Sequence, residues 1–252
     1  MEKLKNLMIL LMVNVSLYAV DIFEEFKNRV QQQYIDPFTK DLTGIVCSNS
    51  INTADSLGLF KAVPPSIGLD LSASFVLKEI SSENIILNEA FKEQDFKYIP
   101  FFSLQISKGL PLNIDLIGRI FSYSNVIFYG AGVKYRFLSF PPIVPVVNCA
   151  VGLFYNVIDA KDILKHNSYS INAVISVDKL PFIRPYMVVG LDNGELTVYE
   201  AIGIGEIKSR FKNGLRYEVG FRLSFVPFVY ISLGYLNVYS VNGYTLNLGL
   251  KF

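Results

Sequence analysis

The chain has no tryptophan, one histidine and two cysteines among its 252 residues, and its net charge is only +1. One histidine with the distant Cys47 and Cys149 cannot supply the four nitrogen and sulfur ligands of a tetrahedral metal site. The balanced charge provides no basic stripe for a nucleic-acid partner. We therefore expect no metal, no cofactor and no nucleic acid. Whether Cys47 and Cys149 pair in a disulfide stays open, since an oxidising envelope would permit it.

Long apolar runs are also missing after the amino terminus, although 51% of the residues are apolar and 14% are aromatic. A membrane-spanning helix needs about 20 consecutive apolar residues, so no spanning helix is expected there. The apolar residues instead alternate with polar ones in short runs, such as Tyr217 to Phe225 and Tyr169 to Val177. A period of two predicts strands with one apolar and one polar face.

The last strand carries the clearest pattern. Its apolar face presents five residues that alternate with Thr245, Asn247, Gly249 and Lys251, namely Tyr244, Leu246, Leu248, Leu250 and Phe252. An alternating strand that ends in Phe resembles the signal by which bacterial outer-membrane barrels are recognised for insertion. The resemblance implies the barrel-assembly machinery and outer-membrane lipid as partners. In such a barrel the apolar face meets acyl chains and the polar face lines the interior.

The amino terminus resembles an export signal over residues 1–19. Lys3 and Lys5 precede an apolar core that runs from Leu7 to about Leu17, and Ala19 ends a plausible cleavage site. Residues 20–33 then predict a short amphipathic helix whose apolar face carries Phe23, Phe26 and Val30, and Asp36-Pro37 is expected to end it. We interpret residues 20–65 as a helix and plug segment that fills the lumen or packs beneath it.

Residues 66–252 predict an all-β fold, a transmembrane antiparallel up-and-down barrel. Ten strands are expected near residues 66–78, 97–108, 112–122, 128–139, 145–156, 169–179, 183–191, 214–225, 228–239 and 244–252. The stretch 192–213 is either an outer hairpin or two further strands, which would make twelve. Four tight proline turns are expected on the periplasmic side, and the longer connections 79–96 and 158–167 outside.

A soluble barrel or sandwich is the strongest rival, because its strands alternate too but with the apolar residues turned inward. The export signal, the terminal Phe and the charges on the inferred inner face favour the membrane barrel. Those charges are Lys78, Asp115, Arg119, Lys134, Arg136, Asp178, Arg184, Glu218, Arg222 and Lys251. In so narrow a barrel they either brace the wall as ion pairs or line a path for a small solute, whereas an open channel needs roughly sixteen strands.

One constellation could support catalysis. His166 and Ser168 share a strand face, and their spacing looks similar to that of outer-membrane lipid A deacylases, with Asp159 or Asp162 as an orienting acid. A solvated histidine at the rim of the outer connection 158–167 is the simpler interpretation. We therefore expect no enzyme activity.

From Pro37 to Phe75 the order of features resembles an uncharacterised family of bacterial outer-membrane proteins. The shared features are Pro37, Asn49-Ser50, Thr53-Ala54 and the Gly- and Ser-rich first strand from Gly68 to Ser72. Ile51 stands where a glycine is expected. The family is distantly similar to the long-chain fatty-acid transporter of the outer membrane, in which an amino-terminal hatch blocks the barrel.

These observations predict a small barrel in the bacterial outer membrane that acts as a passive channel or transporter for small or hydrophobic solutes. The first alternative is a sealed structural or interaction barrel without transport. The second is an outer-leaflet lipid-modifying enzyme. The resemblance rests on shared architecture, so it indicates a hydrophobic ligand without identifying it.

Overall fold

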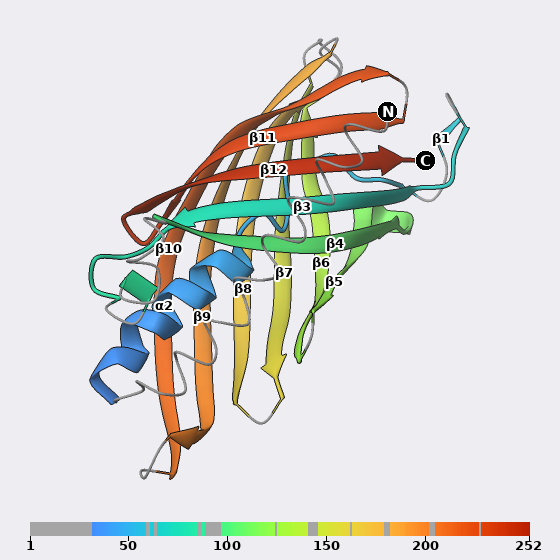
Figure 1. The fold of residues 1–252 in the computed structure, drawn as a ribbon. Helices are drawn as coiled ribbons and strands as arrows, with labels where there is room; N and C mark the ends of the chain where they lie inside the picture. Colours follow the sequence, from blue (N-terminus) through green and yellow to red (C-terminus); the bar gives the residue numbers. More distant parts are fainter. Residues whose placement is uncertain are drawn as a thin grey trace, which may run out of the picture.

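The computed structural model describes residues 32–58, 61–62, 65–84, 87–88, 97–123, 125–140, 146–161, 163–178, 182–201, 205–226 and 228–252. In this part of the chain, ten strands form a closed antiparallel barrel (Figure 1). The export signal predicted at 1–19 lies outside the described residues. So do Phe23, Phe26 and Val30 of the predicted amphipathic helix.

Within the described residues, the long helix α2 at Gln32–Cys47 precedes the barrel, and a short hairpin follows it, made of β1 at Lys61–Ala62 and β2 at Pro65–Ser66. The barrel strands are β3 (Leu69–Glu79), β4 (Tyr98–Gly109), β5 (Ile114–Tyr123), β6 (Val126–Phe140), β7 (Val146–Ala160), β8 (Leu164–Asp178), β9 (Ile183–Ala201), β10 (Gly205–Val226), β11 (Val229–Val238) and β12 (Val241–Lys251). The 3-10 turn η2 at Pro111–Asn113 lies between β4 and β5.

Each barrel strand pairs with its neighbours in the chain, and β12 closes the circle against β3. Leu248 lies opposite Ala73 in that closing ladder. Phe252 and Leu69 exchange two backbone hydrogen bonds of 2.9 and 2.7 Å. The prediction of ten strands in up-and-down order is therefore confirmed. Residues 192–213 extend β9 and β10 as one long hairpin, with Arg210 opposite Glu195, and do not form two further strands.

The two ends of the barrel differ. At the turn end, which holds Leu69 and Phe252, the connections are the short segments 110–113, 141–145, 179–182 and 227–228. At the loop end, the long connection is 80–97, whereas 124–125, 161–163, 202–204 and 239–240 are short. The expected long connection 158–167 is therefore wrong, since β7 reaches Ala160 and β8 starts at Leu164.

The outer wall is apolar, as a membrane barrel requires. Leu71, Leu104 and Ile171 are exposed, whereas Ser72, Ser74 and Asn247 are buried inside. Tyr98 and Tyr235 both contact Tyr244 near the loop end, with ring centroids 6.4 and 6.1 Å apart. Phe228 and Phe252 stack 6.3 Å apart at the turn end. An apolar wall between two aromatic zones identifies a transmembrane β-barrel, and β12 turns Tyr244, Leu250 and Phe252 outward as predicted.

The alternation reverses where the strands extend toward the loop end. Ile158, Leu164 and Leu196 are buried inside, while Lys208 and Arg210 face outward and are exposed. This part of the wall follows the pattern of a soluble barrel, with apolar residues in and charged residues out. The sequence interpretation turned every apolar residue of a strand toward lipid. It therefore assigned residues 158–167, whose apolar side chains point inward, to a loop.

Helix α2 also departs from expectation, because Asp36-Pro37 does not end a helix. Pro37 lies inside α2, which continues to Cys47. A proline inside a helix removes one backbone hydrogen bond and costs about 3 kcal/mol. The residues that follow offset this cost, since Phe38, Ile45 and Val46 are buried against the strand extensions in one apolar cluster. None of the helices in the described part of the chain is long and apolar enough to cross a bilayer.

The orientation of the wall predicts a contrast between two leucine substitutions. Leu233 lies on the outer face of β11 and Leu112 in the turn after β4, and both are exposed. Leu233→Arg should destabilise the barrel by about 2–4 kcal/mol because a cation then lies in hydrocarbon. Leu112→Arg, at the membrane boundary, should cost no more than about 1 kcal/mol. Urea unfolding in phospholipid vesicles measures both, and equal losses would contradict the assignment of the outer wall to lipid.

Candidate functional site

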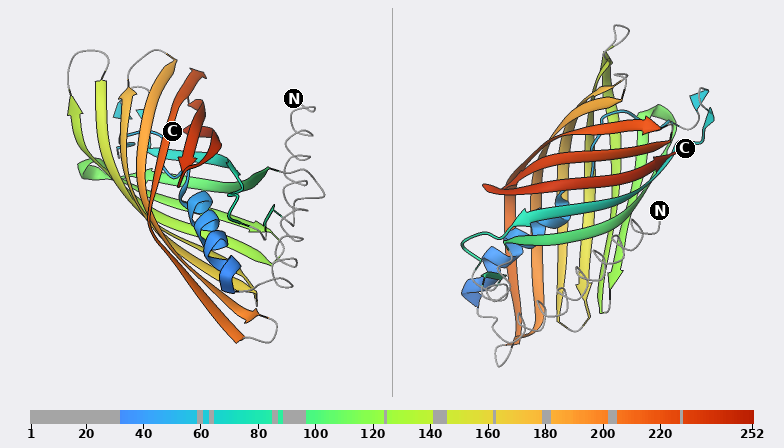
Figure 2. Two further views of the ribbon diagram at one scale, coloured as in Figure 1. Left: turned by 90° about the vertical axis from the view of Figure 1, so that its left-hand side faces the viewer. Right: turned by 45° about the horizontal axis from the view of Figure 1, so that its top comes forward.

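Residues 32–58, here called the plug, run through the lumen from the loop end to the turn end. Helix α2 packs along the inner faces of β8, β9 and β10 and also contacts β3 and β7 (Figure 2). Two glycines allow this close approach. A Cβ at Gly44 would overlap Val238 of β11, and a Cβ at Gly194 of β9 would overlap the Thr43 hydroxyl.

At the loop end, the plug is held by a buried ion pair. Lys78 Nζ of β3 lies 2.5 Å from Asp41 Oδ1 of α2, and both side chains are almost completely buried. The second carboxylate oxygen of Asp41 accepts hydrogen bonds from the Ser81 backbone N–H at 3.4 Å and from Asn84 Nδ2 at 2.8 Å. The carboxylate therefore has three partners, whereas the Lys78 ammonium otherwise donates to the Glu79 carbonyl, at 3.1 Å.

The carboxyl end of α2 is capped by the wall. Arg119 of β5 donates hydrogen bonds to the Val46 carbonyl at 2.8 Å and the Ser48 carbonyl at 3.2 Å. The last carbonyls of a helix lack intrahelical partners and carry partial negative charge, so a guanidinium is well placed there. Its Cζ also lies 5.2 Å from the centre of the Phe128 ring.

Asn49 follows the helix and bonds to both strands that close the barrel. Its φ of 54° is the left-handed conformation that often ends a helix. Asn49 Nδ2 donates to Ser74 Oγ of β3 at 2.7 Å, and Asn49 Oδ1 accepts from Asn247 Nδ2 of β12 at 2.5 Å. Ser74 and Asn247 are direct partners in the closing ladder. One plug side chain therefore spans the closure of the barrel.

Two further plug residues are linked to arginines of the wall, Ser50 through Asn172 and Asn52 directly. Ser50 Oγ accepts from Asn172 Nδ2 at 3.2 Å, and Asn172 Oδ1 accepts from Arg216 at 2.6 Å. Arg216 in turn forms a fully buried ion pair with Asp192, at 2.9 Å. Asn52 accepts from Arg222, whose Cζ lies 3.9 Å from the centre of the Tyr230 ring.

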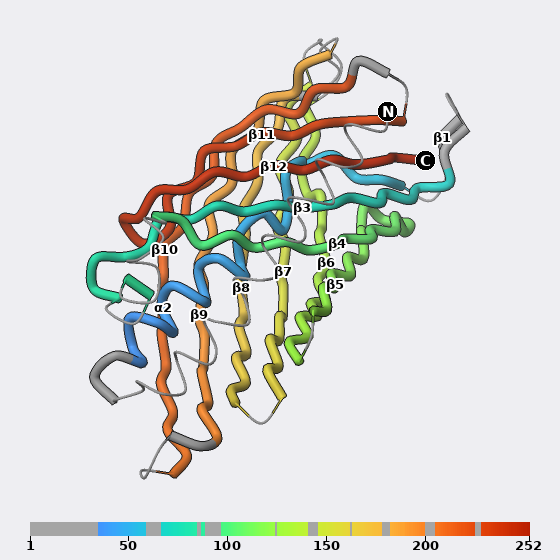
Figure 3. The backbone as a smooth tube through the Cα atoms, in the orientation of Figure 1, coloured from blue at the N-terminus to red at the C-terminus, as the bar shows by residue number. Residues whose placement is uncertain are grey.

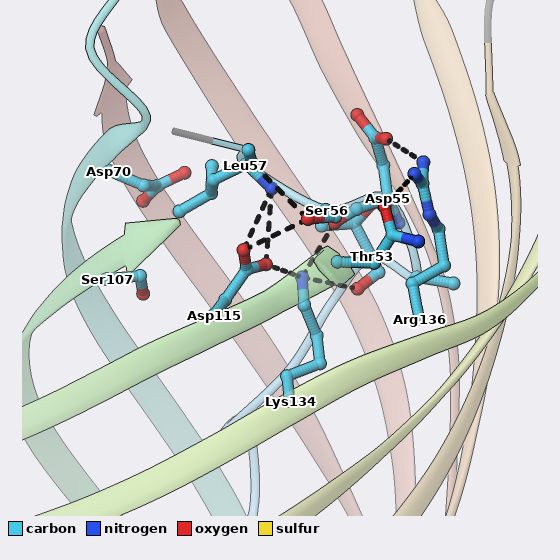
Figure 4. A network of polar contacts seen from close by, with 12 residues as sticks. Thr53, Asp55, Ser56, Leu57, Asp70, Ser107, Asp115, Lys134 and Arg136 are labelled. Carbon is cyan, nitrogen blue, oxygen red and sulfur yellow. Dashed lines mark hydrogen bonds and ion pairs between the residues drawn. The ribbon is translucent and has the colours of Figure 1, made fainter. Parts of the chain in front are cut away.

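At the turn end, five charged residues form a group that we call the latch: Asp55, Asp115, Lys134, Arg136 and Lys251. Figure 4 shows the first four of them. Asp115 accepts the Leu57 backbone N–H at 3.0 Å and lies 2.9 Å from Lys134 Nζ. Lys134 also donates to the Asp55 carbonyl at 2.7 Å. The Asp55 carboxylate lies 3.2 Å from Arg136 and 3.5 Å from Lys251.

The structure thus places most of the predicted lumen charges around the plug. Lys78, Arg119, Arg222 and the wall residues of the latch contact it directly, through the bonds given above. Glu218 is buried on β10, where it accepts hydrogen bonds of 2.9 Å from Tyr186 and from Thr245. Arg184 is half-buried at the start of β9, opposite Arg222 in the ladder. Asp178 ends β8 at the turn end.

Several residues of the site were missed by the sequence interpretation. Asp41 and Asp55 belong to the plug, and Asp192 lies in the stretch 192–213 that was assigned to the outside. Arg216 lies within the predicted strand 214–225 and alternates in step with Glu218 and Arg222. The signal for Asp192 is present in the sequence, because it alternates in step with Val188 and Gly190. The signal for the two plug aspartates is absent, since a partner across the lumen leaves no local periodicity. The Asn49-Ser50 and Thr53-Ala54 elements of the family resemblance all make hydrogen bonds to the wall.

The hypothetical catalytic pair has a different environment from the one expected. His166 and Ser168 are fully buried on the inner face of β8, not solvated at a rim, and His166 Nε2 lies 2.9 Å from the Thr43 hydroxyl of α2. Asp159 lies on β7 opposite Lys165 and faces the other side of the wall. Asp162 lies outside the described residues. The histidine therefore contacts the plug, while the considered acid Asp159 does not share its face.

Cys47 at the end of α2 and Cys149 on β7 are both free thiols. Among the residues that the structure describes, no three His, Cys, Asp or Glu side chains gather as metal ligands.

A small cavity lies between the plug residues 50–53 and Asp70, Tyr230 and Arg222, and its volume is about 30 Å³. A cavity of this size holds no more than a few water molecules, so the plug nearly fills this level of the lumen.

The unequal bonding of Asp41 and Lys78 predicts unequal effects of their substitution. Asp41→Asn leaves a buried ammonium without a counter-ion and should destabilise the protein by about 3–5 kcal/mol. Lys78→Met should cost less, because the Asp41 carboxylate keeps the Ser81 and Asn84 donors. Glu83→Gln, which removes the exposed pair with Lys40, is the control and should change little. Denaturant unfolding in detergent measures all three, and equal losses for the first two would contradict this account.

Comparison with known proteins adds little beyond the architecture. The KdgM porin in complex with disordered oligogalacturonate is 8% identical, with a TM-score of 0.39 over 73% of this chain and 99% of that chain. Neisserial surface protein A is 16% identical, with a TM-score of 0.31 over 73% and 97%. LpxR from Salmonella typhimurium is 11% identical, with a TM-score of 0.35 over 73% and 100%.

These likenesses are too low to transfer a ligand or an activity. No curated protein sequence matches the chain. The distant similarity to the long-chain fatty-acid transporter stays a prediction. A family model does match residues 63–252, which include all ten barrel strands. The chain therefore belongs to the family of unknown function DUF6588.

Proposed function

We propose that the protein is a bacterial outer-membrane barrel whose lumen is a path for a small, hydrophobic solute, and that the plug is the gate of this path. The observation that carries the proposal is the chemistry of the interface between plug and wall. From Asn49 to Leu57 the plug is bonded to β3, β5, β6, β8, β10 and β12 through hydrogen bonds and ion pairs.

The polar interface from Asn49 to Leu57 favours a movable segment there over a permanent core. Buried apolar surface is costly to expose, whereas hydrogen-bonding groups that separate can bond to water instead. The latch in particular is partly accessible, since the side chains of Asp55, Arg136 and Lys251 are 18%, 23% and 19% exposed. Water that enters at the turn end can therefore replace the bonds of Asp55 one at a time.

A hydrophobic solute is favoured by the lining at the opposite end. There the lumen is bounded by Leu164, Leu196, Val198 and Leu236, which now contact the apolar face of α2. If α2 shifts along the wall, it leaves an apolar chamber above a polar passage. The sealed barrel remains the rival function, and it requires that the plug never leaves.

Conductance of the reconstituted protein tests the gate. Asp55→Asn removes two ion pairs of about 1 kcal/mol each, which should shift the plug equilibrium toward the open form by roughly 30-fold. The open fraction in planar bilayers and the rate of liposome swelling should both rise. Glu195→Gln is the matched control, because it breaks the exposed pair with Arg210 and does not touch the plug.

Deletion of residues 20–65 gives the highest conductance that removal of the plug can produce. The deletion variant should conduct more than Asp55→Asn, provided that it still forms a heat-resistant barrel on gels. If the wild type, Asp55→Asn and the deletion variant all show no conductance, the gated path is rejected and the sealed barrel is favoured.

A further inference from the structure

Strand β10 is longer than the neighbour that pairs with it on one side. It pairs with β9 from Gly205 to Leu223, but its ladder with β11 begins only at Arg216. Strand β11 ends at Val238 and turns into β12, whereas the loop-end part of β10 extends beyond this turn (Figure 3). Within the described residues, the β11 side of β10 therefore has no partner strand over residues 206–214. We call this side the free edge.

The free edge lies in water and not in hydrocarbon. The side chains of Lys208 and Arg210 are 56% and 64% exposed, and Lys212 is exposed as well. The apolar outer wall of β10 begins only at Leu215 and Tyr217. Unpaired peptide groups are not tolerated in a bilayer, but in water they remain available for bonding. An unpaired edge in water is a template on which another strand can form.

The ladder with β9 determines which residues of β10 face the free edge. Tyr199 of β9 donates its N–H to β8, so the preceding Val198 faces β10, where its partner is Ile207. Peptide groups of an antiparallel strand point to its two sides at alternate residues. Lys208 and Arg210 therefore turn their N–H and C=O groups toward the free edge.

Charge selects the strand that can pair there. Over residues 206–214 the charged side chains are Glu206 and three cations, Lys208, Arg210 and Lys212. In a symmetric antiparallel pairing of two copies centred on Ser209, Lys208 would lie opposite the second copy's Arg210, and like charges directly opposite are destabilising. A strand with acidic residues at alternate positions would place carboxylates opposite these cations. The free edge thus opposes self-association and favours an acidic partner.

The ion pairs already present do not prevent this. Lys208 lies 2.9 Å from Glu206, and Arg210 lies 3.1 Å from Glu195 of β9. Both pairs are exposed, so each contributes little and leaves the cation open to a further carboxylate.

The inner side of this segment is held in place by the rest of the protein. Ile207 is buried in the apolar cluster of α2, and Ser209 Oγ donates to Asp36 of α2 at 2.6 Å. The Phe211 ring lies 4.7 Å from that of Tyr239. The edge is therefore ordered before a partner binds, which lowers the entropy cost of binding. Inward side chains of an added strand would lie beside Ile207 and Phe211, so they should be apolar.

We infer that the free edge of β10 is a docking site for an extended acidic segment of another protein. The segment adds to the sheet as an antiparallel strand, with its acidic side chains outward and its apolar side chains inward. Backbone hydrogen bonds provide the affinity, and the cations of β10 select the sequence. The inference does not rest on the gate, because the barrel need not conduct.

Hydrogen exchange with a synthetic peptide tests the free edge. The peptide alternates valine and glutamate and has the length of segment 206–214. With the protein in nonionic detergent, it should slow amide exchange in 206–214 and leave β8 unchanged, since residues 171–176 are paired on both sides. A peptide that alternates valine and lysine should have no effect.

Methylation of the peptide nitrogens distinguishes strand addition from charge attraction alone. Glutamates opposite Lys208 and Arg210 would share hydrogen bonds with them, whereas the valine N–H groups would point away from β10. N-methylation at the glutamates should therefore weaken binding by roughly tenfold or more, and N-methylation at the valines should leave it unchanged. Equal binding of the two methylated peptides would overturn the inference, as would no binding of the unmodified one.

A charge reversal on β10 tests the selection. The double variant Lys208→Glu with Arg210→Glu should lose the glutamate peptide and bind the lysine peptide instead. Lys165→Glu, which makes the same kind of change on β8, is the control. Heat-modified gel mobility verifies folding, and the wild type with the two methylated peptides decides if a variant does not fold.

The free protein provides the last part of the test. Without peptide, the amides of Lys208 and Arg210 should exchange fast. Protection at any protein concentration would mean that the chain itself covers the edge, and protection that rises with concentration would identify a second copy as the occupant. Either result would overturn the inference.

Discussion

The structure depends on one constraint: the polar inner wall of a narrow membrane barrel must find hydrogen-bond partners where bulk water is absent. Buried charges without partners cost several kcal/mol each. The plug supplies those partners, largely through its backbone. Arg119 binds the carbonyls of Val46 and Ser48, and Lys134 binds those of Thr53 and Asp55. Asp115 accepts the N–H of Leu57. Residues 46–57 thus take the place of solvent for the wall.

The surroundings of the barrel change along its axis from hydrocarbon to water, and this change explains the rest of the architecture. Over the membrane-spanning part, hydrocarbon outside and polar contacts inside require apolar residues out and polar residues in. Beyond it, water surrounds the strand extensions, and the apolar face of α2 then requires the reverse pattern. Ile158, Leu196 and Ile207 are accordingly buried inside, while Lys208 and Arg210 are exposed. The same strand changes its pattern at the point where its surroundings change.

This change marks the limit of what the sequence could predict. Alternation identified the ten strands and their orientation, because Leu250 and Phe252 share a face over a whole strand. Alternation failed at 158–167, where the pattern of polar and apolar residues reverses. The prediction that Pro37 ends the helix failed for a different reason, because tertiary burial outweighs the local helix-breaking signal. The sequence predicts that the charged side chains of the wall point inward, but it does not predict which residues they contact. Asp41 with Lys78 and Asp55 with Arg136 are far apart in the chain, and no local pattern encodes such contacts.

The plug is held in different ways at its two ends, and in the proposed gate this asymmetry decides which end is released first. At the loop end, α2 is fixed by apolar packing and by the buried pair of Asp41 and Lys78. At the turn end, Asp55 is held by cations that water can reach. The weaker end should therefore release first, with Asn49, which leaves the helix in a left-handed conformation, as the natural pivot. For the proposed gate, release of the latch is then the first step and a shift of α2 the second.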